Sequence, residues 1–264
     1  MTRTDVRIGE HRIRLGFKTD RFVPYARARF ASPVADADAD APPDIAIDVE
    51  DGYGGPFQGY DVAVRRDEDT ISFRRADYFI EANATYASVR LRAHDELAFK
   101  HALMTVYSAF IVHNRWGLLL HSSCVVGEDG FARMFAGPSG AGKSTAAALS
   151  LPRRVLSDEA TLVSLAGSRP IVYDSPFRSE LEGEPGAAPA PLGGAYLLRQ
   201  WPTHERRAVP KADAMLALLD KVFYWRVDAE DTGKAVALLR ALVDAVPVGE
   251  LRFHKDPGFW ELIS

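Results

Sequence analysis

The segment "GPSGAGKS" at residues 137–144 combines glycines, a lysine and a hydroxyl residue at a spacing that can hold a phosphate group. Glycines let the backbone adopt positive φ and approach a ligand closely, so that successive N–H groups point at phosphate oxygens. Lys143 would lie against the β and γ phosphates of a nucleotide triphosphate such as ATP, and the Ser144 hydroxyl would coordinate Mg²⁺. The predicted nucleotide-binding residues are Gly137, Pro138, Ser139, Gly140, Ala141, Gly142, Lys143, Ser144 and Thr145.

An acidic pair, Asp158 and Glu159 in "VLSDEATLV", follows the loop after a short helix, a break at Pro152 and a strand. Because this connection is short, we expect the carboxylates of Asp158 and Glu159 to lie beside the phosphate loop. One of them can hold Mg²⁺ together with Ser144, and the other can accept a proton from an attacking hydroxyl. An acidic pair after a strand is ordinarily a solvated turn, but the neighbouring phosphate loop favours the functional interpretation.

Two further residues are weaker candidates. His121 lies in "GLLLHSSCVV", on the strand before the phosphate-loop strand. If the two strands pair through the "EDG" turn, His121 could lie beside the loop or far from it, and a histidine on an apolar strand is more often a core residue than a catalytic one. Arg178 in "DSPFRSELEG" could neutralise charge on a transferred phosphoryl group, although a salt bridge explains it equally well.

The elements that must position these residues differ along the chain. Residues 1–94 carry short alternating runs broken by Gly, Pro and Asp, which predict a β-rich N-terminal region of antiparallel hairpins. Within it, the acidic insert "ASPVADADADAPP" at residues 31–43 is predicted to be a mobile loop or an edge connection. Residues 95–113 have apolar side chains at helical spacing behind a potential Asp95 cap, so a packed helix is expected to open a second domain at 95–264.

In the second domain, "GLLLHSSCVVG" and "FARMFAG" are predicted to form a hairpin whose second strand leads into the phosphate loop. The later segments "RRVLSDEATLVSL", "PIVYDSP" and "GAYLLRQ" are typical of strands, and two amphipathic helices follow. The fold class is therefore α/β (α+β) with a mixed sheet. Near the C-terminus, Phe259 and Trp260 are expected to anchor the chain end to the core, and His204 and His254 to be solvated.

Composition limits the partners. The chain has 264 residues, 32 basic and 36 acidic, with a net charge of -4, so no broad basic field would attract nucleic acid or an anionic membrane. Cys124 is the single cysteine, which excludes an internal disulfide. The first residues lack a signal-peptide core and no segment offers eighteen uninterrupted apolar residues, so a soluble cytoplasmic protein is expected.

The segments "LHSSCVV", "FAGPSGAGKST" and "LSDEATLV", in that order and at those separations, resemble the catalytic domain of bacterial HPr kinase/phosphorylase and its looser relatives. The resemblance covers about residues 115–185 and, more weakly, the C-terminal helices. It implies a P-loop kinase domain of the HPr kinase and PEP-carboxykinase type, in a possible homo-oligomer. By the same resemblance, His121 matches the family histidine, Asp158 the metal-binding acid and Glu159 the acid that activates the substrate hydroxyl.

The sequence departs from that family pattern in two places. Its acidic dyad is Asp158 and Glu159 rather than two aspartates, and no convincing match exists for the C-terminal segment that engages the carrier protein HPr. The resemblance therefore implies a serine kinase that phosphorylates a peptide or small protein, and it does not identify this client. Two alternatives stay open: a nucleotide-binding regulator without phosphotransfer, and a kinase for a small metabolite.

Overall fold

The computed structural model describes residues 2–30, 42–179, 181 and 186–264, and the internal contacts divide the chain into two units. The first unit comprises Met1–Asn114 and Tyr224–Thr232, and the second comprises Arg115–Phe223 and Gly233–Ser264. The boundary between the two units comes after the helix at 96–113, so this helix belongs to the first unit. The sequence predicted a boundary before the helix, between residues 94 and 95. Most of the acidic insert, residues 31–41, lies outside the described residues.

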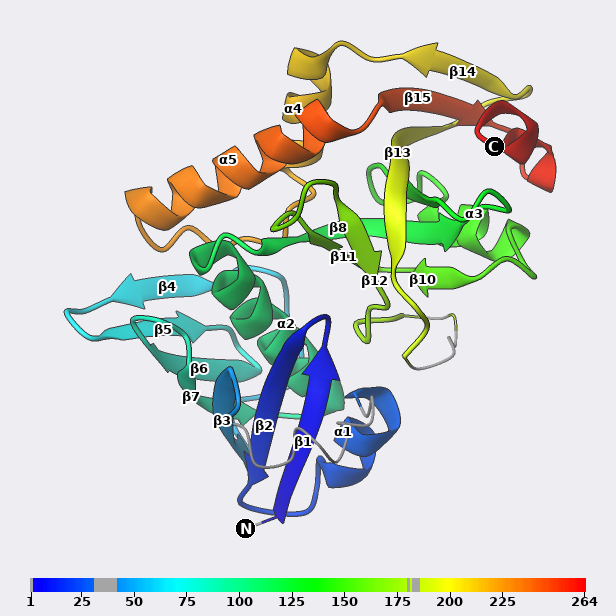
Figure 1. Ribbon diagram of the computed structural model, residues 1–264. Helices are drawn as coiled ribbons and strands as arrows, with labels where there is room; N and C mark the ends of the chain where they lie inside the picture. Colours follow the sequence, from blue (N-terminus) through cyan, green and yellow to red (C-terminus); the bar gives the residue numbers. More distant parts are fainter. Residues whose placement is uncertain (1, 31–41, 180, 182–185) are drawn as a thin grey trace. The chain divides into compact units, whose positions relative to one another are not determined.

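The first unit is built on a seven-stranded sheet with the strand order β1-β2-β3-β7-β6-β5-β4 (Figure 1). Along β3 the side chains of Ile45, Ile47 and Val49 are buried and those of Ala46 and Asp48 are exposed, because successive strand residues point to opposite faces. One face of this strand is therefore apolar and packed. The strands are β1 (Thr2–Ile8), β2 (His11–Phe17), β3 (Ile45–Asp51), β4 (Ala63–Arg66), β5 (Thr70–Arg74), β6 (Tyr78–Asn83) and β7 (Ser88–Ala93).

The prediction of antiparallel hairpins is right for part of this sheet only. The pairs β1–β2, β4–β5, β5–β6 and β6–β7 are antiparallel, but β3 runs parallel to both of its neighbours, β2 and β7. Parallel neighbours need a crossover connection instead of a tight turn. Helix α1 (Val23–Phe30) lies in the crossover from β2 to β3, and alternation within single strands gave no sign of it.

Helix α2 (Glu96–His113) begins at the predicted cap. The Asp95 carboxylate accepts a hydrogen bond of 2.8 Å from the backbone N–H of Ala98, which satisfies one of the donors left free at a helix start. All side chains from Ala98 to Val112 are buried, including those of Lys100 and His101, so the predicted packed helix is confirmed. The helix is thus a core element rather than a surface one.

The second unit contains an eight-stranded mixed sheet, so the protein has a mixed α/β architecture with two mixed sheets. The predicted hairpin is confirmed, since β8 and β9 pair antiparallel from Ser122–Ala136 to Val126–Ala132. The predicted strand in "RRVLSDEATLVSL" is instead two short strands with Asp158 and Glu159 between them. The strands are β8 (Gly117–Val126), β9 (Ala132–Ala136), β10 (Val155–Ser157), β11 (Ala160–Ser164), β12 (Ile171–Tyr173), β13 (Ala190–Gln200), β14 (Glu205–Ala208) and β15 (Val248–Phe253).

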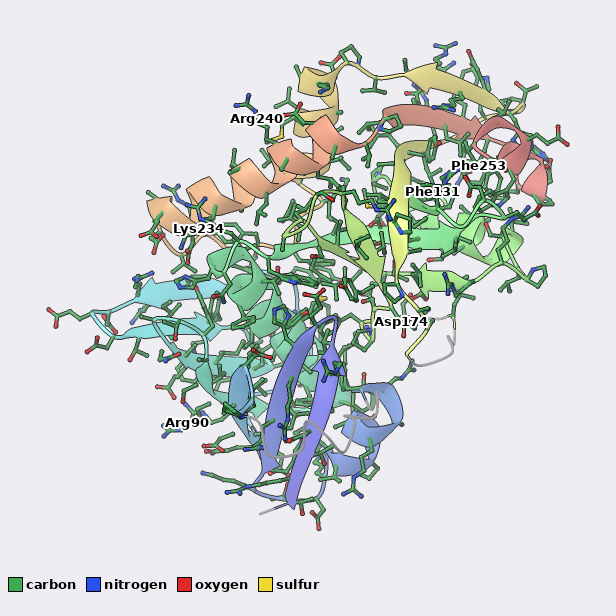
Figure 2. All side chains as sticks on the ribbon, viewed as in Figure 1. Arg90, Phe131, Asp174, Lys234, Arg240 and Phe253 are labelled. Atoms are coloured by element: carbon green, nitrogen blue, oxygen red, sulfur yellow. The ribbon has the colours of Figure 1, made fainter. Side chains whose placement is uncertain are left out.

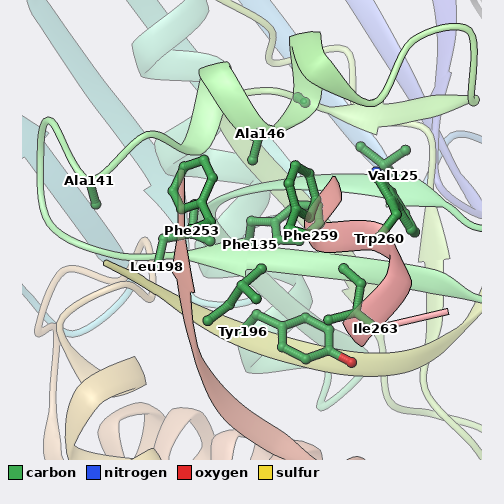
Figure 3. Close-up of a cluster of buried hydrophobic side chains, with 12 residues drawn as sticks. Val125, Phe135, Ala141, Ala146, Tyr196, Leu198, Phe253, Phe259, Trp260 and Ile263 are labelled. Atoms are coloured by element: carbon green, nitrogen blue, oxygen red, sulfur yellow. The ribbon is translucent and has the colours of Figure 1, made fainter. Parts of the chain in front are cut away.

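A buried cluster packs helix α3 (Lys143–Leu149) and the chain end onto the central strands of this sheet (Figure 3). Ala146 and Ala147 come from α3, Phe135 from β9, and Phe259 and Trp260 from the 3-10 helix η2 (Pro257–Leu262). The prediction that Phe259 and Trp260 anchor the C-terminus is therefore confirmed. Among the residues that the structure describes, the other helices of the chain's C-terminal part are α4 (Lys211–Leu219) and α5 (Ala229–Ala245).

Candidate functional site: a glycine-rich loop and the strand beside it

The glycine-rich segment connects a buried strand to a helix. Strand β9 ends at Ala136, the loop spans residues 137–142, and α3 begins at Lys143. Gly140 and Gly142 have φ values of +76° and +103°, which side chains with a Cβ rarely adopt. A Cβ on Gly142 would lie 2.7 Å from the ring of Phe253, so this glycine also permits a close approach between the loop and β15. Figures 2 and 3 label Phe253 on that strand.

Lys143 folds back over the loop that precedes it. Its ammonium group donates to the carbonyl oxygens of Gly137 at 3.0 Å and Pro138 at 3.1 Å, and its side chain is buried. Burial lowers the pKa of Lys143, and the positive charge of Lys221 lowers it further. Within the described part of the chain, the hydrogen bonds of this buried cation go to neutral carbonyls, which it can exchange for the oxygens of an anion.

Other contacts fix the shape of the loop. Gln200, the last residue of β13, donates from its side-chain amide to the carbonyl of Gly140 at 2.8 Å. On the opposite strand, the Ser123 hydroxyl donates to the carbonyl of Lys143 at 2.8 Å. Ser144 lies half-buried on the first turn of α3, and Pro138, Ser139 and Gly140 are exposed. The predicted binding residues thus form one continuous loop with an exposed tip.

The pairing of β8 determines where His121 lies. Ser122 is opposite Ala136, the last residue of β9, so His121 lies where β9 turns away into the phosphate loop. On the other side of β8, His121 is opposite Ala160 in β11. The two positions that the sequence left open are thereby resolved, and His121 is beside the start of the loop.

The electrostatic surroundings of His121 include two other predicted site residues. Burial lowers the pKa of His121, the positive charge of Lys143 lowers it further, and the charge of Glu159 opposes this change. The net lowering of its pKa favours the neutral form of the imidazole. Its ring also lies 5.7 Å from that of Phe223, centroid to centroid. Lys143, His121 and Glu159 thus share one electrostatic environment.

The two acidic residues lie in the break between β10 and β11 and have different roles in the fold. The backbone carbonyl of Glu159 accepts from the Ser122 N–H at 3.1 Å, and its side chain is half-buried. Asp158 is buried, and its carboxylate accepts from the backbone N–H groups of Ser179 at 3.1 Å and Leu181 at 2.8 Å and from the Ser179 hydroxyl at 3.0 Å. Asp158 therefore holds the segment after β12 against the acidic pair.

Arg178 forms a buried ion pair. Its guanidinium donates to the Asp174 carboxylate at 2.5 Å and to the carbonyl of Val155 at 2.9 Å. Burial raises the pKa of Asp174, and the charge of Arg178 opposes that rise. This arrangement matches the salt bridge considered for Arg178, and its contact with transferred phosphate stays a prediction.

The two C-terminal histidines share one carboxylate. His204 Nε2 lies 2.8 Å from Asp256 Oδ1, and His254 Nδ1 lies 3.0 Å from Asp256 Oδ2. The hydrogen bond from His204 is the main reason that the pKa of Asp256 falls to about 2. His254 is largely exposed as expected, but the His204 side chain is only 20% exposed, so its predicted solvation is wrong.

The loop and its surroundings fit a nucleotide with Mg²⁺ by the chemistry of their donors. Mg²⁺ prefers oxygen ligands and is usually bound by one or two protein groups plus substrate phosphates. The Ser144 hydroxyl and the Asp158 carboxylate supply such oxygens. Within the described ranges, no three His, Cys, Asp or Glu side chains gather closely enough to hold a metal unaided, so phosphate oxygens would have to complete the coordination.

Two residues of this region were not singled out from the sequence: Gln200, which holds the loop tip, and Lys221, which acts electrostatically on Lys143 and His121. Each lies outside the loop motif and reaches it only through strand pairing. A lysine that follows an aspartate at a helix end, as at residues 220–221, is typical of a surface ion pair. The sequence around Lys221 therefore did not indicate a functional role.

Comparisons with known proteins gave no match to any protein-family model and none to a curated protein. In the described part of the chain, no helix has both the length and the apolar character needed to cross a bilayer.

Proposed function

We propose that the protein is an ATP- and Mg²⁺-dependent kinase that transfers the γ-phosphoryl group to a serine-type hydroxyl of a peptide or small protein. The observation that carries this proposal is that His121 lies beside the start of the glycine-rich loop, where the charges of both Lys143 and Glu159 act on it. A basic group to bind phosphate and a carboxylate to accept a proton are what phosphoryl transfer to a hydroxyl requires. The resemblance of these segments to HPr kinase/phosphorylase supports the same activity.

In the proposed reaction, the acceptor oxygen forms a bond to the γ-phosphorus as the bond from that phosphorus to the β–γ bridging oxygen breaks. ADP leaves with the bonding electron pair, and the hydroxyl proton passes to the carboxylate of Glu159. Lys143 holds the phosphates through its ammonium group and exchanges the carbonyls of Gly137 and Pro138 for them. Neutral His121 accepts or donates a hydrogen bond at the acceptor without adding charge.

Mg²⁺, held by Ser144 and Asp158, would neutralise charge on the phosphate oxygens when bound. For Asp158 this requires at least one of its hydrogen bonds to Ser179 or Leu181 to be exchanged. The chain's own residues otherwise position the reactants. The loop backbone binds phosphate, the pairing of β8 with β11 and β9 fixes His121, and the hydrogen bond from the Ser122 N–H fixes the backbone of Glu159.

The test is transfer of labelled γ-phosphate from ATP, with Mg²⁺, into a library of hydroxyl-bearing peptides and a cell extract. Wild type is expected to label a small number of acceptors. Lys143→Ala should abolish labelling, and Glu159→Gln should reduce it by about 10²–10⁴-fold, the usual contribution of a general base. Glu128→Gln, at an exposed site on the β8–β9 turn, serves as the control and should label as wild type does. Equal labelling by wild type and Lys143→Ala would refute the proposal.

A second candidate, a nucleotide-dependent regulator, is favoured by one observation. Asp158 holds Ser179 and Leu181, so metal or nucleotide binding at Asp158 would change the conformation of that segment. If the protein is a regulator, we expect strong ATP binding and altered protease cleavage near Arg178, with no labelled phosphate on any acceptor. If it is a kinase, we expect labelled phosphate on an acceptor.

A further inference from the structure

Strand β8 has a second partner on the edge that β9 occupies. Its backbone groups point alternately to its two edges, as in any strand. Ser123 pairs with Phe135 on the β9 edge, and the backbone N–H of His121, two residues earlier and therefore on the same edge, donates to the carbonyl of Lys221 at 2.6 Å. The segment 221–223 therefore occupies the position that β9 leaves when it turns into the phosphate loop.

The register of this segment places Lys221 opposite His121. Leu120 and Val222 form an antiparallel bridge, and the Phe223 N–H donates to the Leu119 carbonyl at 2.9 Å. One step along from the bridge, Lys221 is the cross-strand neighbour of His121, and cross-strand neighbours project from the same face. The ring contact between His121 and Phe223, at 5.7 Å, agrees with this assignment.

That face of β8 is also the face on which the phosphate loop ends. Ser123 and His121 are two residues apart and so point to the same side of the sheet. The Ser123 hydroxyl reaches the carbonyl of Lys143 on that side, at 2.8 Å. The two ends of the loop are therefore surrounded by Lys143, His121 and Lys221. The charge of Lys221 lowers the pKa of Lys143, which is consistent with the proximity of the two lysines.

Two lysines at one site repel each other unless an anion lies between them. Lys221 has a side chain only 12% exposed, and its ammonium group contacts the Asp220 carboxylate at 2.6 Å, while Asp220 itself is 70% exposed. A counter-ion in contact with solvent is weakly held, because water screens the pair. Lys221 can therefore exchange Asp220 for a more highly charged group at low cost.

We propose that Lys221 is a second phosphate-binding residue, which contacts the polyphosphate of a nucleotide from the edge of β8 that β9 leaves when it turns into the loop. This inference rests on the proposed nucleotide site and extends it to a residue outside the loop motif. Asp220 is the counter-ion that the polyphosphate replaces.

The test is calorimetric titration of the full chain with ATP and Mg²⁺. Lys221→Met is expected to raise the Kd about tenfold or more, as for loss of a hydrogen bond to a charged group, and Lys221→Arg to restore affinity to within about threefold of wild type. Asp220→Asn, which removes only the exposed counter-ion, is expected to lower the Kd several-fold. The matched control is Lys211→Met, because Lys211 forms a similar 2.7 Å ion pair with Asp244 away from the site and should leave the Kd unchanged.

Unchanged affinity in Lys221→Met, with affinity lost in Lys143→Ala, would overturn this inference and leave the proposed nucleotide site intact. Failure of wild type to bind ATP would overturn both. If Lys221→Met does not fold, as judged by its melting curve, Asp220→Asn decides: a lower Kd supports the role of Lys221, and an unchanged Kd contradicts it.

Discussion

At the scale of single residues, two lysines define the candidate site. Each lysine binds a partner that would hold it less strongly than the phosphate proposed as its ligand. Lys143 is bound by two neutral carbonyls, and Lys221 by a carboxylate open to solvent. Both cations lie at the ends of one loop whose glycines leave room for a bound anion. If the proposed nucleotide site is correct, these residues are preorganised for phosphate.

Gly142 and Gly140 give a matched pair of substitutions. Gly142→Ala would place a Cβ 2.7 Å from the Phe253 ring at a φ of +103°, so we expect a loss of about 2–4 kcal/mol in the free energy of unfolding and weaker ATP binding. Gly140→Ala has no atom within 4 Å of its new Cβ and should cost only about 1–2 kcal/mol from its positive φ. Urea unfolding measures both. Equal losses would show that Phe253 does not constrain the loop.

His101 makes stability sensitive to acid. Its pKa falls to about 4, mainly through burial and then through the charge of Arg75, whose guanidinium donates to His101 Nδ1 at 2.8 Å. The unfolded chain therefore binds more protons than the folded one between about pH 6.5 and pH 4, and stability must decrease as pH falls through that window.

The expected slope from His101 is at most about 1.4 kcal/mol per pH unit. Replacing it with Asn, which keeps a polar side chain beside Arg75, should flatten the curve of unfolding free energy between pH 6.5 and 4. Above pH 7 the difference in stability between the variant and wild type should be independent of pH. An unchanged slope in His101→Asn would show that other groups cause the acid sensitivity.

At the scale of elements, helix α3 and the chain end stabilise each other. The Trp260 indole N–H donates to the Ser150 hydroxyl at 2.9 Å, just after α3 ends, and Phe259 contacts Phe253, the residue against Gly142. The C-terminal turn thus supports the phosphate loop through two aromatic residues.

Phe259→Ala should therefore affect both stability and function. Removing this fully buried ring is expected to cost about 3–5 kcal/mol in the free energy of unfolding and to weaken ATP binding in the folded fraction. Leu262→Ala, at a partly exposed site in the same turn, should cost less than about 1 kcal/mol. Chemical unfolding followed by calorimetry separates the two effects. Unaltered ATP affinity in folded Phe259→Ala would show that the turn does not support the loop.

Local elements were predictable from the sequence where local chemistry determines them. The glycine and lysine spacing of the phosphate loop, the Asp95 cap and the β8–β9 hairpin all depend on neighbouring residues, and the structure has each of them. The parallel pairs of β3 and the approach of Lys221 to β8 depend on pairing between distant segments, which no periodicity encodes. The partners of Asp158, which are Ser179 and Leu181, could not be predicted for the same reason.

At the scale of the whole molecule, the chain passes between its two units more than once. The segment Tyr224–Thr232 belongs to the first unit, where Asp228 pairs with Arg66 and Asp231 Oδ1 lies 3.2 Å from His113 Nδ1. These ion pairs restrain the segment Tyr224–Thr232 within the first unit, and Lys221 of the second unit lies three residues before that segment in the sequence.

Asp231→Ala should release that restraint. Because Asp231 is buried against His113, its loss is expected to destabilise the first unit by about 1–3 kcal/mol and to speed hydrogen exchange at amides 224–232. Arg226→Ala, at an exposed position in the same segment, should change neither. Exchange followed by mass spectrometry reports on the segment directly. Unchanged protection in Asp231→Ala would contradict the anchoring role.

The most direct test of the central claim is calorimetric titration of wild type and Lys143→Ala with ATP and Mg²⁺. The phosphate site predicts saturable binding by wild type with one nucleotide per chain, and at least a hundredfold loss of affinity in Lys143→Ala, because two or more charged hydrogen bonds to phosphate disappear. Absence of binding by wild type, or equal binding by both proteins, would contradict the account.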